Sequence, residues 1–274
     1  MSNTKYTYAV ARIRALEVSL FSDAVIEQLL ACKTAEQALQ LVTEKGWGDP
    51  SSDRDMDAVL KREEEKTWEV IRDVAPDMSV FDVLSYPKLY HNLKAAIKEV
   101  CTETRNPGIF YDDCQIPGRE MLQIVENREF SKLPRGMSRV AEEAFDTLLH
   151  TRDGQLCDIM IDKAALDAIC EAGRRSGEPI IQDYADTTVA IADIKIAVRS
   201  QKTGKSVDFM RSTMAECAGL NIEQLIRAAL AGADEIAQYL EGTSYAGGAD
   251  ALRESPSAFE RWCDNRMIET LKPQ

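Results

Sequence analysis

A Gly-Lys-Ser triplet, Gly204–Ser206, is the first candidate for chemistry because it resembles the end of a phosphate-binding loop. Such a loop reads G-x-x-x-x-G-K-[ST] and holds phosphate with the backbone N–H groups of a glycine-rich turn. The first glycine would stand at position 199, which is Arg199, and the residues before it have helical rather than strand periodicity. We therefore predict a turn between two helices, in which Gly204 adopts a left-handed conformation and Ser206 caps the second helix.

The two histidines and a pair of acidic residues could in principle bind a metal ion. His91 and His150 lie far apart and belong to no His-x-x-x-His or Cys–His pattern of the kind that binds zinc. Asp112 and Asp113, with Glu103 nearby, could gather a divalent cation. They lack the D-x-D-x-D-G spacing of a calcium loop, so solvated carboxylates are the favoured interpretation. We expect no metal ion and no cofactor.

The sequence also gives little support for nucleophilic catalysis. No G-x-S-x-G elbow occurs, and the seven cysteines are scattered and never form Cys-x-x-Cys. Cys157 and His150 could form a nucleophile and its base, but a structural cysteine on a helix is the favoured alternative. An odd number of scattered cysteines also suits a reducing cytoplasm better than a disulfide framework. We expect no catalytic residue.

The net charge of −13 over 274 residues restricts the classes of partner. Binding to nucleic-acid phosphates or to an anionic lipid surface requires a surplus of Lys and Arg, which this chain lacks. A protein partner with a basic face is compatible with the charge. No secretory leader and no run of about 18 apolar residues occurs, so we expect a cytoplasmic protein that does not insert into lipid.

Helical periodicity extends through nearly the whole chain and predicts an all-α fold without significant β-sheet. Ser22, Thr34 and Ser255 have the features of N-cap residues, and the glycine-rich stretch TSYAGGAD at 243–250 is typical of a loop. Helices are expected at about 5–20, from 22, at 34–46 and 55–74, from Pro87 to about 100, from about 119, from about 136, at 155–173, 179–199, 206–218 and 221–241, and from 255.

One irregular stretch, TETRNPGIFYDDCQIPG at 102–118, interrupts the helical pattern with two prolines and two glycines. We predict a loop there that joins two modules, 1–101 and 119–274.

An internal echo also suggests a modular design. The segments Arg12–Leu16, Asn92–Ala96 and Asp193–Ala197 read RIRAL, NLKAA and DIKIA, so each has a polar, an apolar and a basic residue in succession. Amphipathic helices also produce such echoes by chance, and duplication therefore remains one of two alternatives.

A series of short motifs closely resembles one family, the C subunit of V-type and archaeal-type rotary ATPases, which is called the d subunit in eukaryotic complexes. The resemblance covers essentially the whole chain, and the order of the motifs carries it rather than any single one. The motifs are YTYAVARIRALE at 6–17, TAEQAL at 34–39, KGWG at 45–48, YHNLK at 90–94, IVEN at 124–127, FSKLP at 130–134, DGQL at 153–156, DIK at 193–195 and WCDN at 262–265.

This resemblance implies a non-catalytic rotor subunit with a funnel-shaped fold of three similar helical modules. Such a funnel sits as a socket on the membrane proteolipid ring and receives the foot of the central stalk, so that torque drives proton or sodium transport. The protein would then be peripheral to the membrane through its complex. Our candidates for the stalk-facing wall are the polar positions of the echo, for which ordinary solvent-facing positions are the alternative: Arg12, Arg14, Asn92, Lys94, Asp193 and Lys195.

The chain is shorter than the resemblance implies, because family members run on past this length with helices that complete the third module. Two other hypotheses remain open. A free-standing helical adaptor could use the same fold to bind a different protein. A nucleotide-binding enzyme built on Gly204–Ser206 is the third, and least favoured, alternative.

Overall fold

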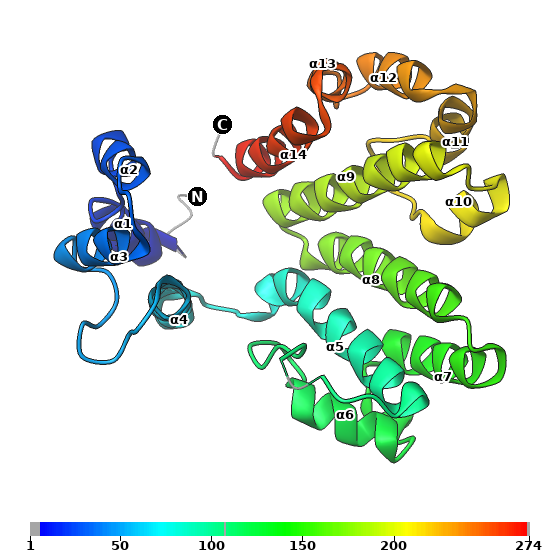
Figure 1. The fold of residues 1–274 in the computed structure, drawn as a ribbon, viewed down its shortest axis with the longest axis horizontal. Coiled ribbons are helices and arrows are strands. Elements are labelled where there is room, and N and C mark those ends of the chain that lie inside the picture. The colour runs from blue at the N-terminus through cyan, green and yellow to red at the C-terminus, as the bar shows by residue number, and fades with distance from the viewer. Residues whose placement is uncertain (1–5, 107, 273–274) are drawn as a thin grey trace. The chain divides into compact units, whose positions relative to one another are not determined.

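The computed structural model describes residues 6–106 and 108–272. Over these ranges the chain forms 14 α-helices and no β-strand, which confirms the predicted all-α fold (Figure 1). The helices belong to two compact units, Met1–Ser79 and Val80–Gln274. The loop 102–118 lies inside the second unit, so the predicted module boundary does not coincide with the boundary between the units.

The first unit contains α1 (Thr7–Glu17), α2 (Asp23–Leu30), α3 (Ala35–Glu44) and α4 (Met56–Val74). The second contains α5 (Asp82–Thr102), α6 (Gly118–Glu126), α7 (Arg135–Thr151), α8 (Gly154–Ser176), α9 (Pro179–Thr203), α10 (Val207–Thr213), α11 (Ile222–Ala231), α12 (Ala233–Glu241), α13 (Gly247–Glu254) and α14 (Pro256–Leu271).

Side-chain caps fix several helix starts where the sequence placed them. The Thr34 hydroxyl accepts a hydrogen bond from the Gln37 amide at 3.3 Å, and the Ser255 hydroxyl accepts one from the Ala258 amide at 3.0 Å. These bonds satisfy amides that have no partner within the first turn of a helix. Ser22 occupies the N-cap position of α2 with extended backbone, but its side chain makes no capping hydrogen bond.

Four predicted boundaries were wrong. Pro87 lies inside α5 instead of opening it, so the helix begins more than one turn earlier. Gly232, with φ 158°, divides the predicted helix 221–241 into α11 and α12. The predicted loop 243–250 is partly helical because α13 begins at Gly247. Finally, α10 ends at Thr213, short of the predicted 218.

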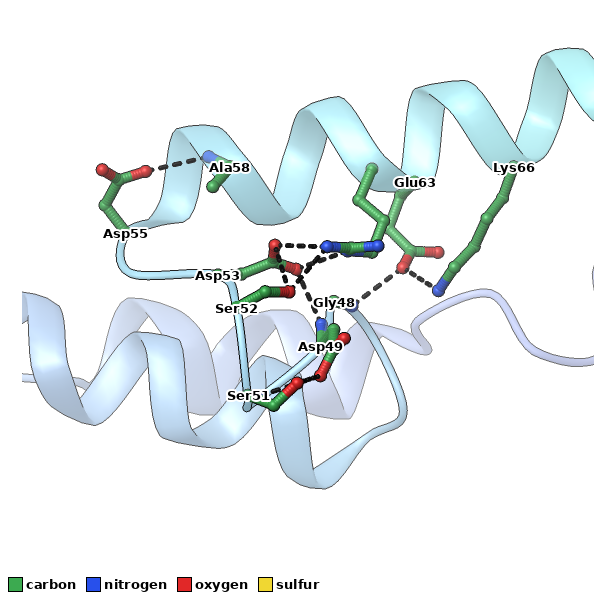
Figure 2. A network of polar contacts seen from close by, with 10 residues as sticks. Gly48, Asp49, Ser51, Ser52, Asp53, Asp55, Ala58, Glu63 and Lys66 are labelled. Carbon is green, nitrogen blue, oxygen red and sulfur yellow. Dashed lines mark hydrogen bonds and ion pairs between the residues drawn. The ribbon is translucent and has the colours of Figure 1, made fainter.

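A polar network ties the α3–α4 loop of the first unit to α4 (Figure 2). The Arg62 guanidinium donates to both carboxylate oxygens of Asp53, at 2.7 and 2.8 Å, and to the Ser52 hydroxyl. Asp53 also accepts from the Asp49 amide, and Glu63 accepts from the Gly48 amide. Hydrogen bonding from Arg62 lowers the pKa of Asp53 to about 2. This network matters because the described part of the unit buries few hydrophobic side chains: Ala9, Val42 and Val59.

The second unit is organised around long helices that lie side by side. α8 packs against α5, α7 and α9, and α14 packs along α9 (Figure 1). The interior is apolar, with large side chains such as Leu93, Ile161, Ile194 and Leu225 fully buried. At Gly173 of α8, an added Cβ would lie 2.5 Å from the Cβ of Ala185, so the absence of a side chain lets α8 and α9 approach closely. Close packing of this kind makes the layer formed by α5, α8 and α9 stiff.

Candidate functional site

A groove of about 860 Å³ lies over α5, α8 and α9 in the second unit and reaches α10. We call it the α5–α9 groove. Two of the six candidate residues, Lys94 of α5 and Lys195 of α9, line it. The apolar part of the lining includes Ile159, Leu166 and Ile196. An apolar floor bordered by charged groups is suited to binding an amphipathic protein segment.

The charge of this groove is opposite to that of the whole chain. Four basic side chains line it, against the two carboxylates of Asp158 and Asp162. The chain as a whole carries −13. A local surplus of positive charge attracts a partner with acidic residues. The acidic surface elsewhere on the chain repels the same partner, so binding at other positions is disfavoured. The basic residues are Lys94, Lys195, Arg199 and Lys205.

Ion pairs hold the two candidate lysines against neighbouring helices. The Lys94 ammonium lies 2.7 Å from a carboxylate oxygen of Asp162 on α8, and their side chains are 24% and 59% exposed. Lys195 forms the corresponding pair with Glu260 on α14. Exposed pairs of this kind add little stability, so both lysines can exchange their partner for an incoming carboxylate at low cost.

The two uncharged or acidic candidates on these helices, Asn92 and Asp193, are fully buried. The Asn92 amide donates to Tyr111 O at 2.7 Å and to Ile116 O at 3.2 Å, and its oxygen accepts from the Tyr111 amide at 2.9 Å. Asp193 Oδ1 accepts from the Ala215 amide at 3.2 Å. Both side chains therefore bind backbone within the unit, and any role at a partner surface would be to position the lysines two residues later.

Burial dominates the electrostatics of Asp193. Desolvation raises the pKa of its carboxyl to about 7, and the hydrogen bond from Ala215 offsets this only in part. Its second oxygen, Oδ2, is buried and has no hydrogen-bond partner. Asp193 is thus a buried acid that is only partly satisfied, unlike Asn92.

The remaining two candidates, Arg12 and Arg14, belong to α1 in the first unit. Arg12 pairs with Asp73 of α4 at 2.6 Å and with the Tyr8 hydroxyl at 2.9 Å. Arg14 is exposed and pairs with Glu17 at 2.8 Å. The structure therefore brings together Lys94 and Lys195 at the groove, and the two arginines lie in the other unit.

The Gly-Lys-Ser triplet forms the predicted turn. Gly204 follows α9 with φ 63° and ψ 37°, in the left-handed region, and the Ser206 hydroxyl accepts from the Phe209 amide at 3.1 Å. Lys205 lies over the Phe209 ring at 4.8 Å, a cation–π contact, and lines the α5–α9 groove. The triplet thus adds a basic residue to the α5–α9 groove.

Sequence reasoning missed Arg199 and Lys205 as groove residues. Lys195 and Arg199 are four residues apart on α9, so their placement on one helix face was visible in the sequence. The position of Lys205 was not, because it depends on how the turn after α9 folds back. Two helices that meet over a common groove are recognised only from tertiary contacts.

The structure also shows the surroundings of the residues considered for nucleophilic catalysis and metal binding. Burial raises the pKa of Cys157 to about 11, and the His150 ring donates from Nδ1 to Asp146 O at 2.7 Å. Asp113 pairs with Lys88. No group of three or more His, Cys, Asp or Glu side chains that could hold a metal ion occurs within residues 6–106 and 108–272. None of the helices described is long and apolar enough to cross a membrane.

Comparison with known families gives a match over almost the entire chain. The family model described as "ATP synthase (C/AC39) subunit" matches residues 9–274. The chain belongs to this family. Membership in the C/AC39 family confirms the resemblance carried by the ordered sequence motifs.

Two curated relatives support the same assignment. The C subunit of the A-type ATP synthase of Methanocaldococcus jannaschii is 22% identical over 301 residues, which covers 97% of this chain and 74% of the relative. The C subunit of the V-type sodium ATPase of Enterococcus hirae is 19% identical over 236 residues, which covers 85% of this chain and 72% of the relative. This C/AC39 protein is therefore similar to C subunits of an A-type ATP synthase and of a V-type sodium ATPase.

Proposed function

We propose that this C/AC39 protein is a non-catalytic part of a rotary ATPase, a socket that couples the central stalk to the membrane proteolipid ring. The α5–α9 groove carries the proposal, because it combines an apolar floor with four basic side chains on an acidic chain. We propose that the groove receives an acidic, amphipathic part of the stalk. ATP hydrolysis and ion binding would then belong to other subunits.

The architecture suits a part that transmits torque. A coupling element needs stiffness and a matched contact surface rather than reactive groups. α5, α8 and α9 are long helices packed side by side, and the pairs Lys94–Asp162 and Lys195–Glu260 link neighbouring helices next to the groove. Force applied at the groove would pass directly into helices with a close-packed interior.

The relatives indicate the type of complex. One is named as a subunit of an A-type ATP synthase and the other as a subunit of a V-type sodium ATPase. We propose that the partners of this chain are the central-stalk subunits and proteolipid ring of its own host's complex, at the membrane periphery. The transported ion and the direction of coupling would be properties of those partners.

Co-purification with the host's central-stalk subunits tests the proposal. The wild-type chain should capture the stalk, and the double variant Lys94→Glu/Lys195→Glu should bind it about tenfold more weakly or worse, because it reverses the charge at the groove. Added salt should weaken the wild-type complex more than that of the variant.

Arg139→Glu is the matched control, since it reverses the charge of an exposed side chain on α7 outside the groove. Its binding should equal that of the wild type. Equal binding by the double variant would contradict the groove as the contact surface. A folded wild-type chain that captures no stalk subunit would contradict the coupling role and favour the adaptor hypothesis.

A further inference from the structure

Side chains of two other helices, α8 and α9, form hydrogen bonds with four backbone groups of the segment between α10 and α11. From α8, the Lys163 ammonium donates to Met214 O at 3.0 Å and the Cys170 thiol to Glu216 O at 3.4 Å. From α9, Asp193 and Asp186 accept from the amides of Ala215 and Ala218, at 3.2 and 3.4 Å. We call the segment 214–218 the clasped segment.

Asp193 is the least satisfied member of this arrangement. Its side chain is fully buried, one carboxyl oxygen binds the Ala215 amide, and the other has no hydrogen-bond partner. The Lys163 ammonium, the nearby cation, is bound to Asp167 at 3.2 Å and to the clasped segment. Within residues 6–106 and 108–272 no ion pair neutralises Asp193, so an ionised carboxylate there would be costly.

At the corresponding position of α5, an uncharged residue, Asn92, makes a buried contact with loop backbone. Asn92 is also fully buried, and it also binds the backbone of a loop that follows its helix. Its amide group donates to two carbonyl oxygens, which an ionised carboxylate could not do. An acid at position 193 makes the equivalent contact on α9 sensitive to protonation.

We propose that Asp193 and the clasped segment form a pH-operated latch, which tightens as the pH falls from neutral and loosens towards neutral pH. The neutral carboxyl is compatible with burial, whereas the carboxylate gains more from water that reaches it when the segment lifts away. Release would open the wall of a second groove, of about 910 Å³, which Met214 and Cys217 help to line. This inference does not depend on the proposed function.

The direction follows from linkage. Burial raises the pKa of Asp193 to about 7 in the closed state, whereas a solvated aspartate has a value of 3.8. The closed state therefore binds the proton more tightly, so its advantage over the open state falls as pH rises from 3.8 to about 7 and then levels off. In that interval the opening constant rises by up to about tenfold per pH unit.

Other ionisable groups lie around the carboxyl, and they act in both directions. Lys163 favours the charged form and Asp167 opposes it. Burial and the charge of Asp193 raise the pKa of the Cys217 thiol to about 12, which keeps that thiol neutral. The ionisable groups that face Asp193 or hold the clasped segment are Lys163, Asp167 and Cys170 on α8, Asp186 on α9, and Glu216 and Cys217 in the segment itself.

Amide hydrogen exchange at Ala215 in the full chain tests the latch, because this amide binds the Asp193 carboxyl directly. After correction for the intrinsic pH dependence, the wild-type exchange rate should rise by up to about tenfold per unit between about pH 5 and 7 and level off above. Asp193→Asn removes the titrating group, so the corrected rate should not vary with pH. Asp186→Asn removes the other carboxylate that holds the segment and should keep the wild-type slope.

A wild-type rate without this slope, or an Asp193→Asn variant that retains it, would overturn the latch. If that variant fails to fold, the carboxyl carbon resonance of Asp193 in the wild type decides. A midpoint near pH 7 supports the latch, and a midpoint near 3.8 overturns it.

Discussion

The helices α5 and α9 share a pattern of buried and exposed residues, and the buried polar residue in this pattern is an amide in α5 and an acid in α9. Both carry a fully buried polar residue, Asn92 or Asp193, followed two positions later by a lysine paired with a returning helix. Both end in the left-handed region, at Glu103 with φ 55° and at Gly204 with φ 63°. The amide nitrogen of Asn92 has acceptors, whereas the matching oxygen of Asp193 has no partner.

The two helices share a buried polar residue that binds the backbone of a later loop, and duplication and chance both remain open as origins of the repeated pattern. The comparison separates two kinds of buried polar residue: the amide of Asn92 satisfies both of its polar atoms, whereas the carboxyl of Asp193 leaves one oxygen unpaired and can respond to pH.

The largest effect is expected from making α5 resemble α9. Asn92→Asp would place a buried carboxylate against the carbonyl oxygens of Tyr111 and Ile116, and we expect a loss of about 4 kcal/mol in unfolding free energy at about pH 8. The loss should be smaller at about pH 5, where the carboxyl is protonated. Urea denaturation followed by circular dichroism at both pH values measures it, and equal losses would argue against a buried acid.

The neighbouring apolar positions should respond alike. Leu93 and Ile194 are both fully buried, so Leu93→Ala and Ile194→Ala should each lower the unfolding free energy by about 3 kcal/mol. The same denaturation measurement applies, with the exposed Leu230→Ala on α11 as a control that should change little. A loss below about 1 kcal/mol at only one of the two sites would show that the two helices are packed differently.

The helix ends should respond with opposite signs. Glu103→Gly relieves a left-handed conformation in a residue with a side chain, and we expect a gain of up to about 1 kcal/mol. Gly204→Ala introduces the same backbone strain and should cost about 1 kcal/mol. No heavy atom lies within 4 Å of the added Cβ, so steric overlap adds nothing to this cost. Thermal denaturation of both variants compares them, and changes of the same sign would contradict a backbone origin.

The smallest effect on stability is expected at the groove. Lys94→Gln and Lys195→Gln remove half-exposed ion pairs, so each should cost less than about 1 kcal/mol in denaturation experiments. Stalk capture by the same variants should nevertheless weaken if the groove is the contact surface. A large stability loss at either lysine would mean that the pair supports the fold instead.

Local sequence rules predicted most of the helices and their caps, because these depend on contacts within a few residues. Thr34 and Ser255 cap their helices, and Gly204 forms the turn that its conformation favours. The rules failed where packing decides. Pro87 is accommodated inside α5, and Gly247 begins a helix next to the Trp262 ring, which leaves space for a residue without a side chain.

Only part of the candidate site could be predicted from the sequence. The echo drew attention to Lys94 and Lys195, which line one groove, but it gave no sign that Asn92 and Asp193 are buried. Hydrophobic spacing does not reveal a buried polar residue, because its partners come from loops about twenty positions later. Arg199 and Lys205 required the tertiary arrangement of α5, α8 and α9.

The pairs that link α5 to α8 and α9 to α14 also bear on how the chain folds. They join residues 68 and 65 positions apart, so each contact can close only after the intervening helices have been made. Contacts over such separations form late, because the entropy of closing the intervening loop opposes them before they add stability. During synthesis, α5 can meet α8 while α14 is still untranslated, so the apolar face of α9 that packs against α14 must wait for the last helix.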